Sequence, residues 1–187
     1  MFYKITFIIR SITSSIICKY FGVFGLKYPH NSTSIIKICK KKKEVTKEIL
    51  LYNKYNVVDN EVKWLKKLHS LDFTPNFISR RNNVITLSYA GQNIDKNNLP
   101  SNWESQLENI AQELDRMDCS HNDIKPSDLL LLDGKIMLID FQWATNINDP
   151  IPKNWPKYIG RKYNSSNKGY NNSISLKNCV LDIMKLK

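Results

Sequence analysis

The chain has few residues of the kinds that build disulfide or metal frameworks. Its 187 residues include four cysteines and three histidines. The cysteines are scattered without a C-x-x-C pair, and no histidine stands at ligand spacing from them. A structural zinc site is therefore not expected. Isolated thiols are typical of a reducing compartment, so the expected location is the cytoplasm.

The sequence also lacks an apolar run long enough to span a membrane. The apolar segment 1–28 is interrupted by Lys4, Arg10 and Lys19, whereas a span needs about 20 apolar residues. Arg10 likewise argues against a signal peptide. Isoleucines recur in this segment at helical spacing, with basic residues elsewhere on the wheel. A basic helix on an acidic membrane surface is one interpretation; a helix or strand pair packed on the first domain is the one we favour.

Acidic residues are outnumbered in this chain. Lys and Arg total 28 against 17 Asp and Glu, which gives a net charge of +11. Such an excess attracts nucleic acid, phosphorylated substrates or acidic membranes. A nucleic-acid-binding protein would group arginine and aromatic residues on one face, whereas this sequence offers mainly lysine runs. Nucleic acid is therefore the partner that we expect least.

The hydrophobic patterns predict a mixture of strands and helices. Strands are expected at residues 33–39, 84–89, 129–132 and 136–139. Helices are expected at residues 60–71, 101–117 and 174–184. Asp133-Gly134 between the last two strands is a strong hairpin signal, and Ser101 with Glu104 predicts a capping box. The lysine run 40–43 should form a solvated turn or the approach to a helix.

One loop after the second predicted helix gathers the groups that phosphoryl transfer needs. Transfer to a hydroxyl requires a group that takes the acceptor's proton, oxygen ligands for Mg²⁺ and a cation near the transferring phosphoryl group. Asp123 lies where a short acid can reach a cleft, and Lys125 can neutralise the γ-phosphate. Asp128 and Asp140 offer the oxygen ligands that Mg²⁺ prefers. The pattern predicts a centre that binds ATP and Mg²⁺.

The same residues carry a family resemblance. H-N-D-I-K-P-S-D at 121–128, followed by L-I-D-F at 138–141, resembles the catalytic loop H-R-D-x-K-P-x-N and the D-F-G motif of eukaryotic-type protein kinases. The resemblance covers roughly residues 33–145. It implies that Asp123 and Lys125 are catalytic, and that the two later aspartates bind the metal.

Upstream segments match in the order that protein kinases have. Within the strand I-I-K-I, Lys37 looks like the lysine that positions ATP, and Lys40 is a rival. Glu61 looks like the C-helix glutamate that partners this lysine. Tyr89 and Ala90 look like the hinge whose backbone binds adenine. The resemblance thus implies four residues that contact or organise ATP, namely Lys37, Glu61, Tyr89 and Ala90.

The sequence departs from the kinase pattern at four places. Asn122 replaces the arginine of H-R-D, so a phosphorylated activation loop would lack its usual partner. Asp128 replaces an asparagine, which keeps an oxygen ligand but changes the charge. Gln142 replaces the D-F-G glycine, which argues against an Asp-Phe flip as a switch. No G-x-G-x-x-G precedes Lys37, so the phosphate-covering loop is reduced or replaced.

No A-P-E motif follows the D-F motif, and little chain remains for the helices on which protein kinases dock peptides. The predicted fold is therefore α+β, a two-lobed protein-kinase-like fold with a truncated C-terminal lobe. The N-terminal lobe, a sheet plus the C-helix, is expected at 1–90 and the reduced C-terminal lobe at 91–187. The chain looks like compact kinase-like enzymes such as lipopolysaccharide-sugar kinases. Segment 151–162, with Trp155 and Tyr158, is the expected acceptor side.

The expected activity is Mg²⁺-dependent transfer of the γ-phosphate of ATP to a hydroxyl of a small molecule or sugar. A minimal Ser/Thr protein kinase is one alternative. Another is a pseudokinase that binds nucleotide without turnover, which Asp128 and Gln142 motivate. The retention of Asp123, Lys125 and Asp140 together favours an enzyme.

Overall fold

The computed structural model describes three ranges of the chain, namely residues 34–49, 55–160 and 170–185. The predictions for segment 1–28 lie outside them. No helix within these ranges is both long and apolar enough to cross a membrane. The chain forms two compact units, divided after Leu51, after Phe77 and after Tyr89. We describe each unit by itself.

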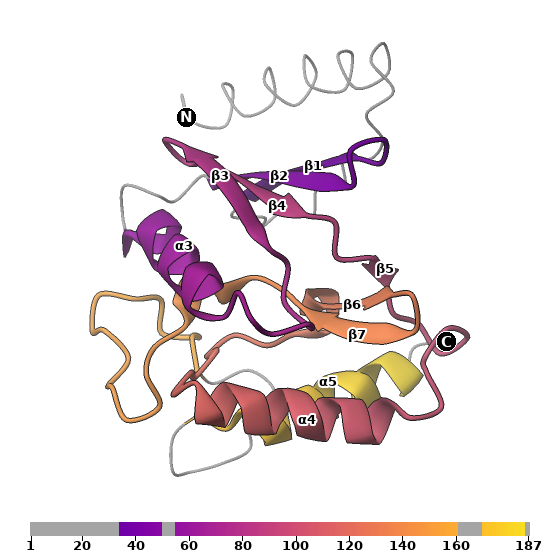
Figure 1. Ribbon diagram of the computed structural model, residues 1–187. Helices are drawn as coiled ribbons and strands as arrows, with labels where there is room; N and C mark the ends of the chain where they lie inside the picture. The colour runs from indigo at the N-terminus through magenta and orange to yellow at the C-terminus, as the bar shows by residue number, and fades with distance from the viewer. Residues whose placement is uncertain (1–33, 50–54, 161–169, 186–187) are drawn as a thin grey trace, which may run out of the picture. The chain divides into compact units, whose positions relative to one another are not determined.

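Unit 1 is built on a four-stranded sheet with the order β1-β2-β4-β3 (Figure 1). Its strands are β1 (Ser34–Cys39), β2 (Glu44–Ile49), β3 (Phe77–Arg81) and β4 (Val84–Ser88). Strand β2 pairs antiparallel with both β1 and β4. The predicted strands at 33–39 and 84–89 are confirmed, and the lysine run forms the exposed turn between β1 and β2.

Two strands of this sheet, β2 and β3, were not predicted from the sequence. Strand β2 reads E-V-T-K-E-I, in which charged residues obscure any apolar pattern. Strand β3 reads F-I-S-R-R, and four of its five residues are exposed. Both are strands because the sheet offers hydrogen-bonding partners, and such tertiary pairing overrides weak local preference.

The described residues of unit 2 form three helices, α3 (Val57–Lys67), α4 (Trp103–Arg116) and α5 (Asn172–Lys185). They correspond to the predicted helices with shifted ends. Helix α3, which corresponds to the expected C-helix, groups with unit 2. From the sequence, this helix is expected in the N-terminal lobe. The predicted capping box on α4 is wrong: the N-cap is Asn102, whose side chain makes no capping hydrogen bond. Instead, the Asn102 carbonyl oxygen accepts a hydrogen bond from Ser105 Oγ (2.9 Å), and Asn102 Oδ1 accepts one from Gln106 Nε2 (2.8 Å).

A small sheet, β5-β6-β7, stands beside these helices. Strands β6 (Leu129–Leu132) and β7 (Lys135–Leu138) pair antiparallel, which confirms the predicted hairpin. Its turn residues have positive φ, 50° at Asp133 and 80° at Gly134, as a two-residue type I′ turn requires. Strand β5 (Gln92–Asn93) was not predicted. Helix α4 packs on α5 and β7, and buried side chains of all three form the core behind the site.

Two glycines with positive φ give a matched test of this packing. A Cβ on Gly91 (φ 103°) would lie 2.1 Å from the Leu131 carbonyl oxygen, whereas nothing lies within 4 Å of one on Gly134 (φ 80°). We expect Gly134→Ala to cost about 1–2 kcal/mol of unfolding free energy, from left-handed strain alone. Gly91→Ala should cost several times more, because the β5–β6 backbones must also separate. Urea unfolding measures both, and equal losses would contradict the steric argument.

Candidate active site

Residues 117–128, between α4 and β6, include the segment that resembles the kinase catalytic loop, and we call them the catalytic loop. The first residues of this loop are fixed by long-range hydrogen bonds. Ser120 pairs with Thr145 through two backbone hydrogen bonds of 2.8 and 2.9 Å. The fully buried His121 ring places Nε2 at 3.0 Å from the Ile139 carbonyl and packs on Phe141 at 4.8 Å between ring centroids. These contacts join the loop to the strand that leads to Asp140.

The predicted catalytic and metal-binding residues converge on one point. The Lys125 ammonium Nζ lies 3.2 Å from Asp123 Oδ2, 3.0 Å from Asp128 Oδ2 and 3.3 Å from Asp140 Oδ2. Asp123 and Lys125 lie in the loop, separated by Ile124. Asp128 ends the 3₁₀ turn η1 (Pro126–Asp128), and Asp140 precedes the 3₁₀ turn η2 (Phe141–Trp143). Three carboxylates therefore surround a single cation.

The electrostatics of this cluster follow from its burial. Burial lowers the pKa of the Lys125 ammonium, but attraction by the three carboxylates is larger and holds that pKa well above its usual value. Burial raises the pKa of Asp128; Lys125 opposes this rise, and the other carboxylates add to it. One ammonium does not balance three carboxylates, so the cluster favours a proton on Asp128 or a second cation. A protonated Asp128 carries the charge of the asparagine that kinases have there.

The donor set fits Mg²⁺. In phosphoryl-transfer sites this ion is held by one or two carboxylates and by the phosphates of the substrate. Among the described residues, no group of three or more His, Cys, Asp or Glu side chains could hold a metal by itself. Asp128 and Asp140 supply the carboxylate pair that a phosphate-completed site needs, and their position as metal ligands stays a prediction.

Asn122, at the position of the H-R-D arginine, ties the loop together. It has φ 65°, a left-handed conformation that asparagine tolerates. Its Nδ2 donates to the Trp143 carbonyl and to Thr145 Oγ1, both at 2.9 Å, and its Oδ1 accepts from Ser120 Oγ at 2.8 Å. Its carbonyl accepts from Gly160 N at 2.7 Å. Asn122 is therefore an internal brace of the loop.

Helix α3 holds the segment that follows Asp140. Asn60 Nδ2 donates to the carbonyls of Gln142 (3.0 Å) and Ala144 (2.9 Å), and Trp64 Nε1 donates to Ala144 (2.8 Å). Gln142 is only 2% exposed, so the residue that replaces the D-F-G glycine is packed inside. Side chains of α3, the helix that carries Glu61, are thus hydrogen-bonded to the backbone of the turn after Asp140.

The C-terminal segment binds the back of the catalytic loop. The Asn172 side chain accepts from His121 N (3.1 Å) and donates to the Cys119 carbonyl (2.7 Å). The Tyr170 hydroxyl accepts from Ile124 N at 2.9 Å. Sequence analysis missed these residues, because neither belongs to a motif and both lie in an Asn- and Ser-rich tail.

The structure distinguishes two lysines of the unit 1 sheet. Lys47 on β2 lies opposite Ile36 and Ile85 and is 6% exposed. Lys37 on β1 lies opposite Thr46 and is half-buried. Cross-strand partners share a face and successive residues alternate, so the two lysines lie on opposite faces. Lys47, which sequence analysis missed, is on β2, the strand that precedes α3 in the chain.

The other predicted ATP residues lie in different settings. Glu61 on α3 is 1% exposed, so it is no solvated surface charge. Tyr89 N donates to the Lys43 carbonyl at 2.8 Å, which leaves that amide unavailable to adenine. Ala90 is 4% exposed. Their roles in ATP binding stay predictions.

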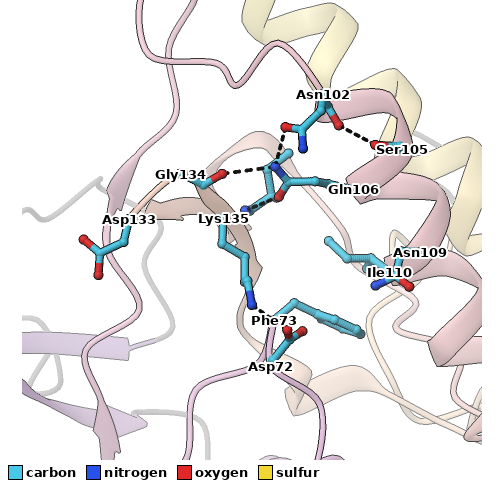
Figure 2. Close-up of a pocket in the computed structure, with 11 residues that line it drawn as sticks. Asp72, Phe73, Asn102, Ser105, Gln106, Asn109, Ile110, Asp133, Gly134 and Lys135 are labelled. Atoms are coloured by element: carbon cyan, nitrogen blue, oxygen red, sulfur yellow. Dashed lines mark hydrogen bonds and ion pairs between the residues drawn. The ribbon is translucent and has the colours of Figure 1, made fainter.

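A pocket of about 380 Å³ lies elsewhere in unit 2, between α4 and the β6–β7 turn (Figure 2). Gln106 connects its walls: Nε2 donates to the Gly134 carbonyl at 3.0 Å, and Oε1 accepts from Ile136 N at 2.7 Å. Lys135 pairs with Asp72 at its mouth. None of the predicted catalytic or metal-binding residues lines this pocket.

Comparisons with known proteins bear on the fold. No protein-family model matches the chain, and no curated protein matches its sequence. Among solved structures, the chain is similar to a Rio2 kinase from Chaetomium thermophilum, described as an ADP/Mg²⁺-phosphoaspartate complex. The identity is 16% and the TM-score 0.55; the match covers 68% of this chain and spans 50% of that one. The predicted kinase-like α+β fold is confirmed.

Proposed function

We propose that this chain is an ATP- and Mg²⁺-dependent phosphotransferase that acts on a hydroxyl of a small molecule or sugar. The observation that carries the proposal is the convergence of three carboxylates on the Lys125 ammonium, at 3.0 to 3.3 Å. A kinase-like fold brings such groups together for positioning and for charge stabilisation, which dominate catalysis of phosphoryl transfer.

Each group of the cluster has a role in the proposed step. The acceptor oxygen forms a bond to the γ-phosphorus while the bond from this phosphorus to the β–γ bridging oxygen breaks, and ADP leaves. Asp123, at the loop tip, accepts the proton of the acceptor hydroxyl. Lys125 stabilises the negative charge on the transferring phosphoryl oxygens.

Asp128 and Asp140 would hold Mg²⁺, which when bound neutralises charge on the β- and γ-phosphates. Both carboxylates already face a cation, the Lys125 ammonium. We expect that ammonium to turn from the carboxylates toward the γ-phosphate when metal and nucleotide bind.

The most direct test of the proposal is stabilisation by nucleotide. ATP with Mg²⁺ should raise the melting temperature of the full chain, because a ligand that binds only the native state stabilises it by mass action. ATP with EDTA and Mg²⁺ alone serve as controls and should give smaller shifts. A melting temperature that ATP and Mg²⁺ together leave unchanged would remove the central claim.

We further propose that Lys47 rather than Lys37 positions ATP. A lysine is rarely buried without a functional or electrostatic reason, and Lys47 is 6% exposed on the central part of the sheet. We expect Lys47→Met to weaken ATP binding at least tenfold. Lys37→Met, the matched control on the opposite face, should change it little. The two affinities are compared by calorimetry, and the reverse order would restore the assignment to Lys37.

A second candidate activity is ATP hydrolysis through a phosphorylated aspartate. The Rio2 structure contains a phosphoaspartate, and here Asp140 Oδ2 lies 3.3 Å from the ammonium proposed to contact the γ-phosphate. The carboxylate oxygen would form a bond to the γ-phosphorus while the bond from this phosphorus to the β–γ bridging oxygen breaks and ADP leaves. Water would later cleave the acyl phosphate, which releases inorganic phosphate and restores the carboxylate. Labelling with γ-³²P-ATP separates the two activities, because an acyl phosphate on the protein is released by hydroxylamine whereas a phosphorylated acceptor is a separate product.

A further inference from the structure

The segment after η2 returns to the catalytic loop and is fixed there at two points. Gly160 N donates to the Asn122 carbonyl at 2.7 Å, next to Asp123. The Trp155 ring meets Trp143 edge-on, with 5.1 Å between ring centroids. Ile159 is 3% exposed. The stretch 155–160, which we call the acceptor loop, is therefore held against the site.

Lys157 and Tyr158 are the exposed residues between these two fixed points, and Tyr158 is the aromatic one. Its side chain is a large ring that is 53% exposed, although Ile159 beside it is buried. Burial of the remainder raises the pKa of the Tyr158 phenol, and Asp123 is the next contributor in the same direction. Tyr158 lies two residues from Gly160, whose amide is bonded to the neighbour of Asp123, and its ring is open to solvent.

An exposed aromatic ring on a segment bonded next to Asp123 suits one chemical class of phosphoryl acceptor well. The face of an aromatic ring is electron-rich, and the C–H groups on one face of a sugar or cyclic polyol are weakly positive. The ring of a sugar or cyclic polyol can therefore stack on the aromatic face, while its hydroxyl groups remain at the edge of the stack. A linear polyol offers the same hydroxyls but no flat apolar face.

We propose that Tyr158 is a specificity-determining residue that stacks on a cyclic polyol or sugar acceptor and directs one of its hydroxyls to Asp123. This inference rests on the proposed phosphotransferase function. The two anchors, at Asn122 and at Trp143, hold the backbone of the acceptor loop in place before the acceptor arrives, so little entropy is lost in ordering this loop on binding.

The test measures ADP formation by the full chain with Mg²⁺-ATP. The cyclic acceptors are glucose, mannose, galactose and myo-inositol; the linear acceptors are glycerol and sorbitol, and casein represents proteins. At least one cyclic acceptor should raise the rate above that in water, and the linear acceptors should not. Tyr158→Ala should lower kcat/KM for that acceptor about tenfold, mainly through KM. Tyr158→Phe, which keeps the aromatic ring, should retain the wild-type kcat/KM for that acceptor.

Met184→Ala removes another exposed apolar side chain, 48% exposed on α5, and serves as the matched control. Stimulation by linear polyols or casein in place of the cyclic acceptors overturns the inference, as does a Tyr158→Ala variant with unchanged acceptor KM. Stimulation by none of the cyclic acceptors, with ATP still hydrolysed, also overturns it while the phosphoryl-transfer site stands. Absence of all ATP binding and turnover in the folded wild-type chain overturns the proposed function itself.

Discussion

Asp123→Asn is expected to abolish phosphoryl transfer while ATP binding stays nearly intact. The amide is similar in size but cannot accept the proton of the acceptor hydroxyl, and loss of a general base costs about 10²–10⁴-fold in rate. The variant also removes one of the three charges around Lys125, which should leave the cluster stable. ADP formation measures the rate, and thermal shift with Mg²⁺-ATP measures binding.

Asp133→Asn is the matched control for this variant. Asp133 lies in the exposed β6–β7 turn with φ 50°, where asparagine is equally favourable. The control should keep wild-type turnover. Turnover of Asp123→Asn equal to that of the wild type would refute the role of Asp123, and loss of nucleotide binding together with turnover would indicate a structural role instead.

Asp140→Ala is expected to abolish the dependence of ATP binding on Mg²⁺. If Asp140 is a metal ligand, its removal leaves only Asp128 to hold the ion against water. The affinity for ATP should then be the same with Mg²⁺ as with EDTA, whereas the wild type should bind more tightly with Mg²⁺. Calorimetric titration of ATP with Mg²⁺ and with EDTA gives the two affinities, and their ratio measures the dependence on Mg²⁺.

The backbone at Asp140 requires a second variant. Asp140 has φ 73°, where alanine is strained and asparagine is tolerated. Asp140→Asn therefore removes the charge without that strain, and it should lose most of the Mg²⁺ dependence at nearly wild-type stability. If both variants keep the full dependence on Mg²⁺, Asp140 is not a ligand and the metal must be held elsewhere.

The parts of the site that sequence analysis found are those whose residues are close together in the chain. Asp123, Lys125 and Asp128 lie within one loop, and a hairpin with a clear turn signal separates them from Asp140. A short segment of this kind has few ways to fold, so residue type and spacing predict where the groups converge. The structure brings the three carboxylates within 3.0 to 3.3 Å of the Lys125 ammonium.

The parts that sequence analysis missed depend on partners far away in the chain. Strand β2 became a strand only through pairing with β1 and β4, and the burial of Lys47 followed from that pairing. Tyr170 and Asn172 bond to the catalytic loop across about fifty residues, and neither carries a local pattern that indicates it. Long-range hydrogen bonds of this kind leave no periodicity in the sequence.

The cluster of three acids around Lys125 was determined by the sequence itself, because order and spacing within a loop and hairpin suffice to bring these residues together. Tertiary structure alone decided how that cluster is held and what faces it. Asn122 and the C-terminal segment fix the loop through bonds between distant elements, and Asn60 fixes the turn after Asp140. The acceptor loop leaves Tyr158 exposed. Burial and exposure are properties of packing, so only the folded chain could distinguish Lys47 from Lys37, and Tyr158 from the other aromatic residues.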